Sequence, residues 1–344
     1  MKFIKYNSID NVTNKELMRF KESNLYDPSA TWYVLEKVHG ANFSVIADGN
    51  GNLIPAKRTS TLDMEDSSFF NFQKIFDKYD FKTLIMNTML MATAYNPDYN
   101  YGVSIHGELC GGFYPDMPLI PGSKQVQKEI KYSNDTEFIV FDIRIYNKDN
   151  EYKFLNHNAV VKACQNLNIP VVPIIFEGTL DECLAWSSEH NADMSEIWKI
   201  FGMPHEVPNN IREGHVIKPA MSLFDRDNRI IFKDKNNKFK ENGGPKEPKK
   251  KAEKIAYSNG MNELFNDISA MICVPRFNNV TSKYGEYSIK NFADIMRLMV
   301  EDIFEDLEND ANMQALSAVE KSTLKGDTLR RVSAFMGANK KDLF

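Results

Sequence analysis

The sequence predicts an α+β protein, in which an N-terminal domain of antiparallel sheets with helices is followed by a small, all-helical C-terminal domain. Three observations predict this division. Short β-rich runs with hairpin turns fill the first two thirds of the 344 residues. Beyond residue 249 no strong strand signal occurs, and apolar residues recur at helical spacing instead. The turn-forming run at 243–245, Gly-Gly-Pro, separates the two patterns, so we expect domains spanning residues 1–243 and 244–344.

The N-terminal elements follow from local composition. Segments rich in β-branched and aromatic residues predict strands at residues 32–35, 42–46, 53–54, 103–108, 137–146 and 171–175. The run Asp-Gly-Asn-Gly-Asn at 48–52 is typical of a hairpin turn and joins the second of these strands to the third. Residues 156–167 have the spacing of a helix.

The C-terminal domain is predicted from one long apolar stripe. Its members recur at three- and four-residue steps and are Ile289, Phe292, Met296, Met299, Ile303 and Leu307. Such spacing places them on one face of a helix of several turns. We expect this face to form the core of the domain.

Composition excludes several classes of protein. With 42% hydrophobic and 26% charged residues, the chain is an ordinary globular protein, neither disordered nor fibrous. Its four cysteines show no paired metal-ligand spacing, and the N-terminus turns polar too early for a signal peptide. The most apolar stretch, residues 84–92, is too short to cross a bilayer. We therefore expect a cytoplasmic monomer with reduced thiols and no membrane role.

Charge is distributed unevenly along the chain. The net charge of −5 argues against a protein that coats nucleic acid regardless of its structure. Residues 233–254, however, hold nine lysines against four acidic residues, a local charge of +5. Two interpretations stay open: a solvated linker, or a surface that follows a nucleic-acid backbone.

Lys37 lies in the run Glu36-Lys37-Val38-His39-Gly40-Ala41-Asn42-Phe43, at a predicted strand end before a turn of small residues. A lysine in this position can present an uncrowded amine to an electrophile. A solvated surface lysine is the other interpretation of this run taken alone.

Further segments occur in a recognisable order after Lys37. They are Ala56-Lys57-Arg58-Thr59, His106-Gly107-Glu108-Leu109, Phe138-Ile139-Val140-Phe141-Asp142-Ile143, Glu213-Gly214-His215-Val216-Ile217-Lys218-Pro219 and Ile231-Phe232-Lys233-Asp234-Lys235. Together they resemble the nucleotidyltransferase motifs shared by ATP-dependent ligases and mRNA capping enzymes. The resemblance is strongest to the RNA ligase 2 family of bacteriophages and trypanosome editing ligases, because His39 stands where that family carries His and the others carry Asp. Residues 276–303 also resemble the C-terminal domain of that family.

The resemblance implies an adenylyltransferase domain of the ATP-grasp-like nucleotidyltransferase type and an ATP-dependent RNA ligase. Such an enzyme joins 3′-hydroxyl and 5′-phosphate ends, here of a nick in duplex RNA or an RNA–DNA hybrid, through lysyl-AMP and a 5′-adenylated RNA. It implies ATP with Mg²⁺ or Mn²⁺ as cofactors, nicked RNA as partner, and the host cytoplasm as location if the chain is phage-encoded. The alternatives are a DNA ligase or mRNA guanylyltransferase on the same scaffold, or a non-catalytic RNA-end binding protein.

The resemblance also assigns candidate residues. The catalytic candidates are Lys37, His39, Glu213, Lys233 and Lys235. The cofactor-binding candidates are Glu36, Val38, Asn42, Arg58, Glu108, Phe141 and Lys218. The RNA-binding candidates are Arg58, Arg276, Asp302 and Lys283, with Arg276 as a phosphate fork oriented by Asp302 and the helical domain recognising the nick.

Residue chemistry supports several of these roles. Lys233 and Lys235 alternate along a strand, so both face one side, where their charges would disfavour the ammonium form of Lys37 and stabilise a phosphate. Glu213 could hold Mg²⁺, or could form an ordinary surface salt bridge. Phe141 could stack on adenine, as the resemblance implies, or be a core residue of its strand.

Overall fold

The computed structural model describes residues 3–13, 15–48, 51–225, 228–239 and 259–344. The chain divides into two compact units, Met1–Asn236 and Asn237–Phe344. The boundary expected near residue 243 lies outside the described residues. Within the described ranges, no helix combines the length and apolar character needed to span a membrane.

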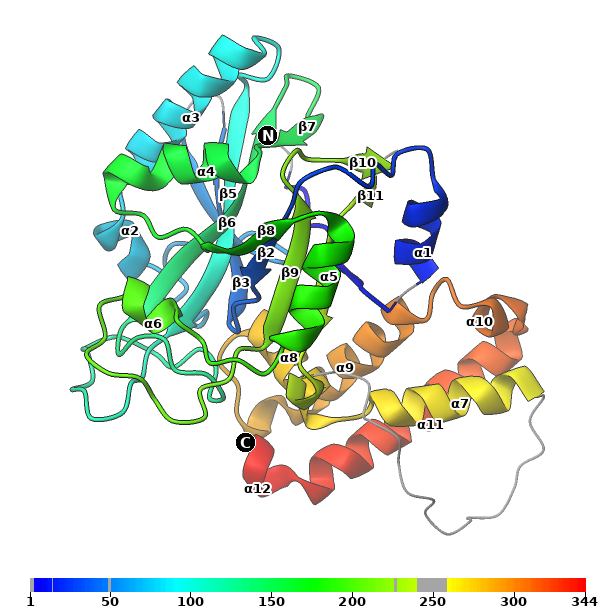
Figure 1. Cartoon of the computed structure of the whole chain (residues 1–344). Helices are drawn as coiled ribbons and strands as arrows, with labels where there is room; N and C mark the ends of the chain where they lie inside the picture. Colours follow the sequence, from blue (N-terminus) through cyan, green and yellow to red (C-terminus); the bar gives the residue numbers. More distant parts are fainter. Residues whose placement is uncertain (1–2, 14, 49–50, 226–227, 240–258) are drawn as a thin grey trace. The chain divides into compact units, whose positions relative to one another are not determined.

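The first unit holds two five-stranded sheets (Figure 1). The first sheet has the order β1 (Asp10–Asn11), β12 (Phe232–Lys235), β9 (Gly214–Pro219), β2 (Trp32–Glu36) and β8 (Ile174–Gly178). Its pairs are antiparallel except for β1 with β12, which is parallel. The second sheet is antiparallel throughout, with the order β4 (Leu53–Lys57), β3 (Ala41–Ala47), β5 (Gly102–Gly111), β6 (Thr136–Tyr146) and β7 (Tyr152–Phe154). A small hairpin pairs β10 (Phe224–Asp225) with β11 (Asn228–Arg229).

Helices cover both sheets and bury their apolar faces. In Figure 1, α5 (Leu180–Glu189) lies along β9 of the first sheet, and its Leu180 and Cys183 share a buried cluster with Trp32, which also receives α1 (Lys15–Glu22). The second sheet is covered by α2 (Lys74–Lys78), α3 (Phe81–Tyr95) and α4 (His157–Cys164). The remaining short elements are η1 (Gln165–Leu167) and α6 (Ile197–Ile200).

The predicted α+β class is confirmed, with one strand displaced. A strand was expected over 171–175, but β8 begins at Ile174. Pro173 has no N–H to give to a ladder, which favours a start after it. Val171 instead forms an isolated bridge to Val140 of β6, so the segment crosses from the second sheet to the first.

The second unit is helical throughout its described residues. Its elements are η2 (Asn237–Phe239), α7 (Asn259–Met271), α8 (Val274–Tyr284), η3 (Ile289–Asn291), α9 (Phe292–Asp306), α10 (Ala311–Ala315), α11 (Ala318–Ala338) and α12 (Lys340–Leu343). The predicted stripe forms the buried face of α9, where Met299 and Ile303 are fully buried. Ile289 is an exception: it lies in η3, before α9 begins, and is 40% exposed.

Candidate active site

Lys37 lies where the chain leaves one sheet and enters the other. It directly follows β2 of the first sheet, and residues 38–40 lead into β3 of the second. Its backbone N–H donates to the Gly214 carbonyl at 2.8 Å, which ties this crossover to β9. Gly40 is required, because a Cβ there would lie 2.0 Å from the Leu109 carbonyl oxygen. The predicted lysine at a strand end, before a small-residue turn, is therefore present.

Glu213 gathers three other catalytic candidates around its carboxylate. Its Oε2 lies 2.9 Å from Lys37 Nζ and 3.2 Å from His39 Nδ1. Its Oε1 lies 3.2 Å from Lys235 Nζ. Glu213 and His39 are both buried, whereas the Lys37 side chain is 22% exposed. The cluster therefore presents an accessible amine above a buried carboxylate that holds three cationic or proton-bearing groups.

The register of two strands explains how Lys235 reaches this cluster. Lys235 pairs with Gly214 across the antiparallel β9–β12 ladder. A Cβ at Gly214 would lie 2.0 Å from the Asp234 carbonyl oxygen, so only glycine permits this close approach. Lys233 lies two residues earlier, and its neighbour Phe232 points into the buried cluster on the opposite face. The alternation expected for the two lysines is therefore present.

The charges of the cluster shift the pKa values of its acid and its histidine. Burial by itself would raise the pKa of Glu213, but the charges of Lys37 and Lys235 outweigh it and hold that pKa well below its usual range. Burial would lower the pKa of His39, but hydrogen bonds to Glu129 and Glu213 reverse the direction and raise it.

Glu108 and Asn42 face the same side of the second sheet. They are directly opposite each other in the β3–β5 ladder, and both are partly exposed. Burial raises the pKa of Glu108 to about 8, although the charge of Lys37 acts in the opposite direction. Arg58 follows β4 and donates to Ser8 Oγ at 2.9 Å, and its charge also acts on Glu108. These three candidates thus lie near the Lys37 cluster.

Phe141 occupies an irregularity of β6 that the alternation pattern did not predict. His106 of β5 pairs with Asp142, but the next residue, Gly107, pairs with Val140. Phe141 is therefore the extra residue of a β-bulge. Its side chain is partly exposed and lies outside the core clusters of the described residues, whereas Val140 is fully buried. The bulge turns an aromatic ring out of the core.

A buried charge cluster, absent from the sequence prediction, supports Phe141 from behind. Asp142 receives both terminal nitrogens of Arg229, at 2.6 and 2.8 Å, and also the Tyr6 hydroxyl. Lys218 Nζ donates to Asp142 at 3.2 Å and to the Phe141 carbonyl at 2.9 Å. Burial would raise the pKa of Asp142, but Arg229 and Lys218 hold it far below its usual range. An acid inside the apolar run at 138–143 was the signal available in the sequence.

Glu36 and Val38 turn their side chains inward. They are 4% and 5% exposed, and Ser195 Oγ donates to Glu36 at 2.6 Å. Burial raises the pKa of Glu36 to about 7, although the hydrogen bond from Ser195 acts in the opposite direction. Any contact of these two residues with a ligand would therefore come from their backbone.

The buried Glu36 carboxyl predicts a pH-dependent stability. Its pKa is higher in the folded state than the value of about 4.3 for an unfolded chain. Its contribution is thus fully present below about pH 4.3 and is lost as the pH rises through 7, by roughly 3 kcal/mol. We expect Glu36→Gln to melt higher than the wild type at pH 8, with a smaller difference at pH 5. Glu177→Gln, an exposed control on β8, should melt like the wild type at both pH values. Equal melting of Glu36→Gln and wild type at both pH values would contradict the shift.

The C-terminal candidates are arranged differently from the expectation. Arg276 of α8 pairs with Asp302 at 2.6 Å and with Asp306 at 2.7 Å, both near the end of α9, and its side chain is 1% exposed. Lys283 also pairs with Asp302. The predicted Arg276–Asp302 partnership is present, but the guanidinium is buried and directed at carboxylates. It therefore does not present a phosphate fork, and its role in the structure is to join α8 to α9.

The described residues contain no group of three or more His, Cys, Asp or Glu side chains that could hold a metal ion. Glu213 is thus the single carboxylate of its cluster with lysines around it.

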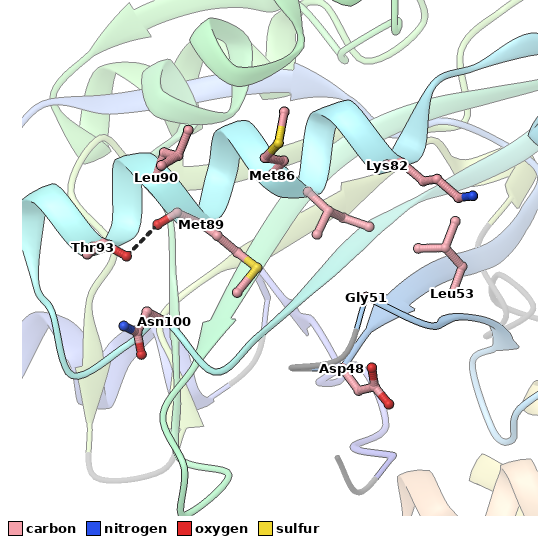
Figure 2. A pocket seen from close by; sticks show the side chains of 10 residues that line it. Asp48, Gly51, Leu53, Lys82, Met86, Met89, Leu90, Thr93 and Asn100 are labelled. Carbon is pink, nitrogen blue, oxygen red and sulfur yellow. Dashed lines mark hydrogen bonds between the residues drawn. The ribbon is translucent and has the colours of Figure 1, made fainter.

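A separate groove of about 520 Å³ lies between α3 and the β3–β4 turn (Figure 2). Its walls include Met86, Met89 and Leu90 of α3 and Leu53 of β4, with Lys82 and Asp48 at its margins. None of the candidate residues lines it. Its mainly apolar walls do not suit a polyphosphate.

Comparison with known proteins gives two family matches. The model of the family described as RNA ligase matches residues 30–235, and the one described as T4 RNA ligase 2 C-terminal matches residues 255–333. The mitochondrial RNA-editing ligase 1 of Trypanosoma brucei brucei is 27% identical over 247 residues, covering 63% of this chain and 50% of that protein. The mitochondrial RNA-editing ligase 2 is 24% identical over 260 residues, covering 70% of this chain and 61% of that protein. The chain thus spans about half the length of the first relative.

Solved structures of a Naegleria gruberi RNA ligase are also similar. The structure with PPi is 16% identical, covers 70% of this chain and 58% of that chain, and has a TM-score of 0.44. A mutant with ATP and Mn is 17% identical, with the same coverages and a TM-score of 0.43.

Proposed function

Because the chain belongs to the RNA ligase family, we propose that it is an ATP-dependent RNA ligase that joins 3′-hydroxyl and 5′-phosphate ends. In this proposal Lys37 attacks the α-phosphorus of ATP, releases pyrophosphate and retains AMP as a phosphoramidate. AMP passes to the RNA 5′-phosphate, and the 3′-hydroxyl then displaces it to form the phosphodiester.

The observation that carries the proposal is the clustering of Lys37, Glu213, Lys235 and His39. Lys37 and Glu213 are 176 positions apart in the sequence, yet their side chains form an ion pair. Cationic side chains beside the amine suit a polyphosphate, since they stabilise the charge that develops on phosphate oxygens during transfer. Once AMP is attached, the Lys37 nitrogen no longer carries an ammonium charge, and its ion pair with Glu213 is released.

A divalent ion fits this arrangement with Glu213 as its protein ligand. Mg²⁺ in nucleotide sites is commonly held by one or two carboxylates together with substrate phosphates. When bound, the ion supplies charge neutralisation at those phosphates. Lys235, on the same carboxylate, keeps Glu213 ionised and oriented in the meantime.

Nucleoside recognition is assigned to the second sheet. Phe141, turned out by its bulge, offers a face for adenine, with Lys218 fixing the backbone at that point. Glu108 and Asn42, opposite each other on one face, can hydrogen-bond ribose hydroxyls, while Arg58 suits a phosphate.

Phe141→Ala tests this assignment. We expect it to weaken ATP binding about tenfold or more, because a base on an aromatic ring gains roughly 1–3 kcal/mol. Its melting temperature should fall only slightly, because the ring is partly exposed. Phe141→Leu should bind ATP better than Phe141→Ala. Val140→Ala, in the adjacent core position, should show the reverse pattern. A large loss of stability with unchanged ATP affinity would assign Phe141 to the core.

We also propose that the substrate is a nick in duplex RNA or an RNA–DNA hybrid, read with the help of the helical unit. The family match over residues 255–333 supports this assignment. A monomeric state and a cytoplasmic location stay predictions.

Transfer of label from nucleotide to protein tests the proposal. With α-labelled ATP and a divalent ion, the full chain should form an acid-labile adduct that peptide mapping places on Lys37. Label from GTP instead would favour a guanylyltransferase, and no label from either would favour a non-catalytic RNA-end binding protein. Sealing of nicked DNA in preference to nicked RNA would favour a DNA ligase.

A further inference from the structure

His39 lies between two carboxylates, only one of which belongs to the candidate set. Its Nδ1 is 3.2 Å from Glu213 Oε2, and its Nε2 is 3.0 Å from Glu129 Oε2. Glu129 comes from the irregular segment between β5 and β6, and none of the motifs described above includes it. The ring is buried, so these two contacts fix its orientation from opposite edges.

The segment that carries Glu129 is itself anchored to the site. The Tyr132 hydroxyl accepts from the His39 backbone N–H at 2.9 Å. Asn210 clamps Lys131 by accepting from its N–H at 2.7 Å and donating to its carbonyl at 2.8 Å. Asn210 lies three residues before Glu213, so one short segment is tied both to His39 and to the chain that leads into Glu213.

Glu129 is also preorganised. Its Oε2 accepts from the Lys128 backbone N–H at 3.1 Å as well as facing His39. The charge and hydrogen bond of His39 lower the pKa of Glu129, although its burial acts in the opposite direction. An ionised acceptor held in this way makes a stronger hydrogen bond than a neutral one.

We propose that Glu129 is a positioning residue for His39, and through His39 for Glu213. This inference rests on the proposed ligase function. Glu129 holds the ring so that Nδ1 faces Glu213 Oε2, which in turn limits the freedom of the carboxylate that pairs with Lys37 and Lys235. Orientation of a reacting amine within a fraction of an ångström affects rate more than affinity. Loss of Glu129 should therefore lower the rate of lysine adenylation and leave the affinity for ATP unchanged.

The kinetic test uses single-turnover adenylation of the full chain over a range of ATP concentrations. Glu129→Ala should lower the maximal rate about tenfold, as expected for loss of a charge-assisted hydrogen bond, with an unchanged half-saturating ATP concentration. Glu129→Gln, whose amide oxygen still accepts from the ring, should recover most of this loss. Glu189→Ala removes an exposed carboxylate at the end of α5 and should behave like the wild type.

A second measurement does not depend on activity. Urea denaturation of the wild type, Glu129→Ala, His39→Ala and the double variant forms a cycle in which the two substitutions should be non-additive, because each removes the same contact. Additive losses would overturn the proposal. So would Glu129→Ala with a wild-type maximal rate, a Gln variant as slow as the Ala variant, or a raised half-saturating ATP concentration with an intact rate. A wild-type protein that takes no label would instead defeat the ligase proposal, while the denaturation cycle would still test the contact.

Discussion

Lys37→Ala is expected to abolish transfer of AMP from ATP to the protein and to leave the fold intact. The side chain ends at the cluster surface and contributes no apolar contact to the core, and Glu213 keeps its contacts with Lys235 and His39. Without the amine no phosphoramidate can form, so the loss should exceed a thousandfold on the scale of a missing nucleophile. The measurement is adduct formation from α-labelled ATP, with a thermal melt as the check on folding.

The same variant separates the first transfer from the last. Given RNA that already carries a 5′-adenylate, Lys37→Ala should still seal, because the amine is used only in the first step. Glu213→Ala and Lys235→Ala should fail in both assays. Lys82→Ala, on α3 beside the separate groove, is the control and should match the wild type. Adduct formation near the wild-type rate would remove Lys37 from the mechanism, and equal defects of Lys37→Ala in both assays would contradict the division of roles.

Asp142→Ala is expected to cause the largest loss of stability. Its carboxylate is buried and compensates two buried cations, Arg229 and Lys218. Removing one partner of such a group leaves charge uncompensated in a low-dielectric environment, which typically costs about 3–5 kcal/mol. ATP affinity should fall as well, since Lys218 would lose a contact while holding the Phe141 carbonyl. Urea denaturation measures the first effect, and an ATP titration under folding conditions measures the second.

Controls for this prediction come from an exposed acid and a conservative change. Asp149→Ala, in the turn between β6 and β7, should change the free energy of unfolding by less than about 0.5 kcal/mol. Asp142→Asn keeps the shape and some hydrogen bonds, so it should fall between the wild type and the Ala variant. If Asp142→Ala were as stable as Asp149→Ala, the cluster would not support β6 in the way described.

Local patterns predicted those features that depend on near neighbours in the chain. Alternation and hairpin chemistry predicted β2, β3 and β5 within a few residues, and helical spacing predicted the buried face of α9. Lys37 at a strand end and the shared face of Lys233 and Lys235 followed from the same periodicities. The resemblance of ordered motifs then predicted an RNA ligase, which the family match confirms at the level of the family.

Contacts between distant segments were decided by the tertiary structure. Alternation predicted whether Phe141 faces the core, but a one-residue bulge inverts that rule, because an extra residue shifts every side chain by one position. Arg276 was expected on the surface, since residue type alone favours it, yet two carboxylates of α9 allow it to be buried.

Sequence by itself therefore determined the order and type of the elements, the nucleophile candidate and the family. Only the tertiary structure decided which polar side chains meet: Lys37 with Glu213, Asp142 with Arg229, and His39 with Glu129. The physical reason is that periodicity reports which face a side chain occupies, whereas its partner depends on how two sheets and a long irregular segment pack. A buried charge needs such a partner, but nothing local to it specifies which residue that will be.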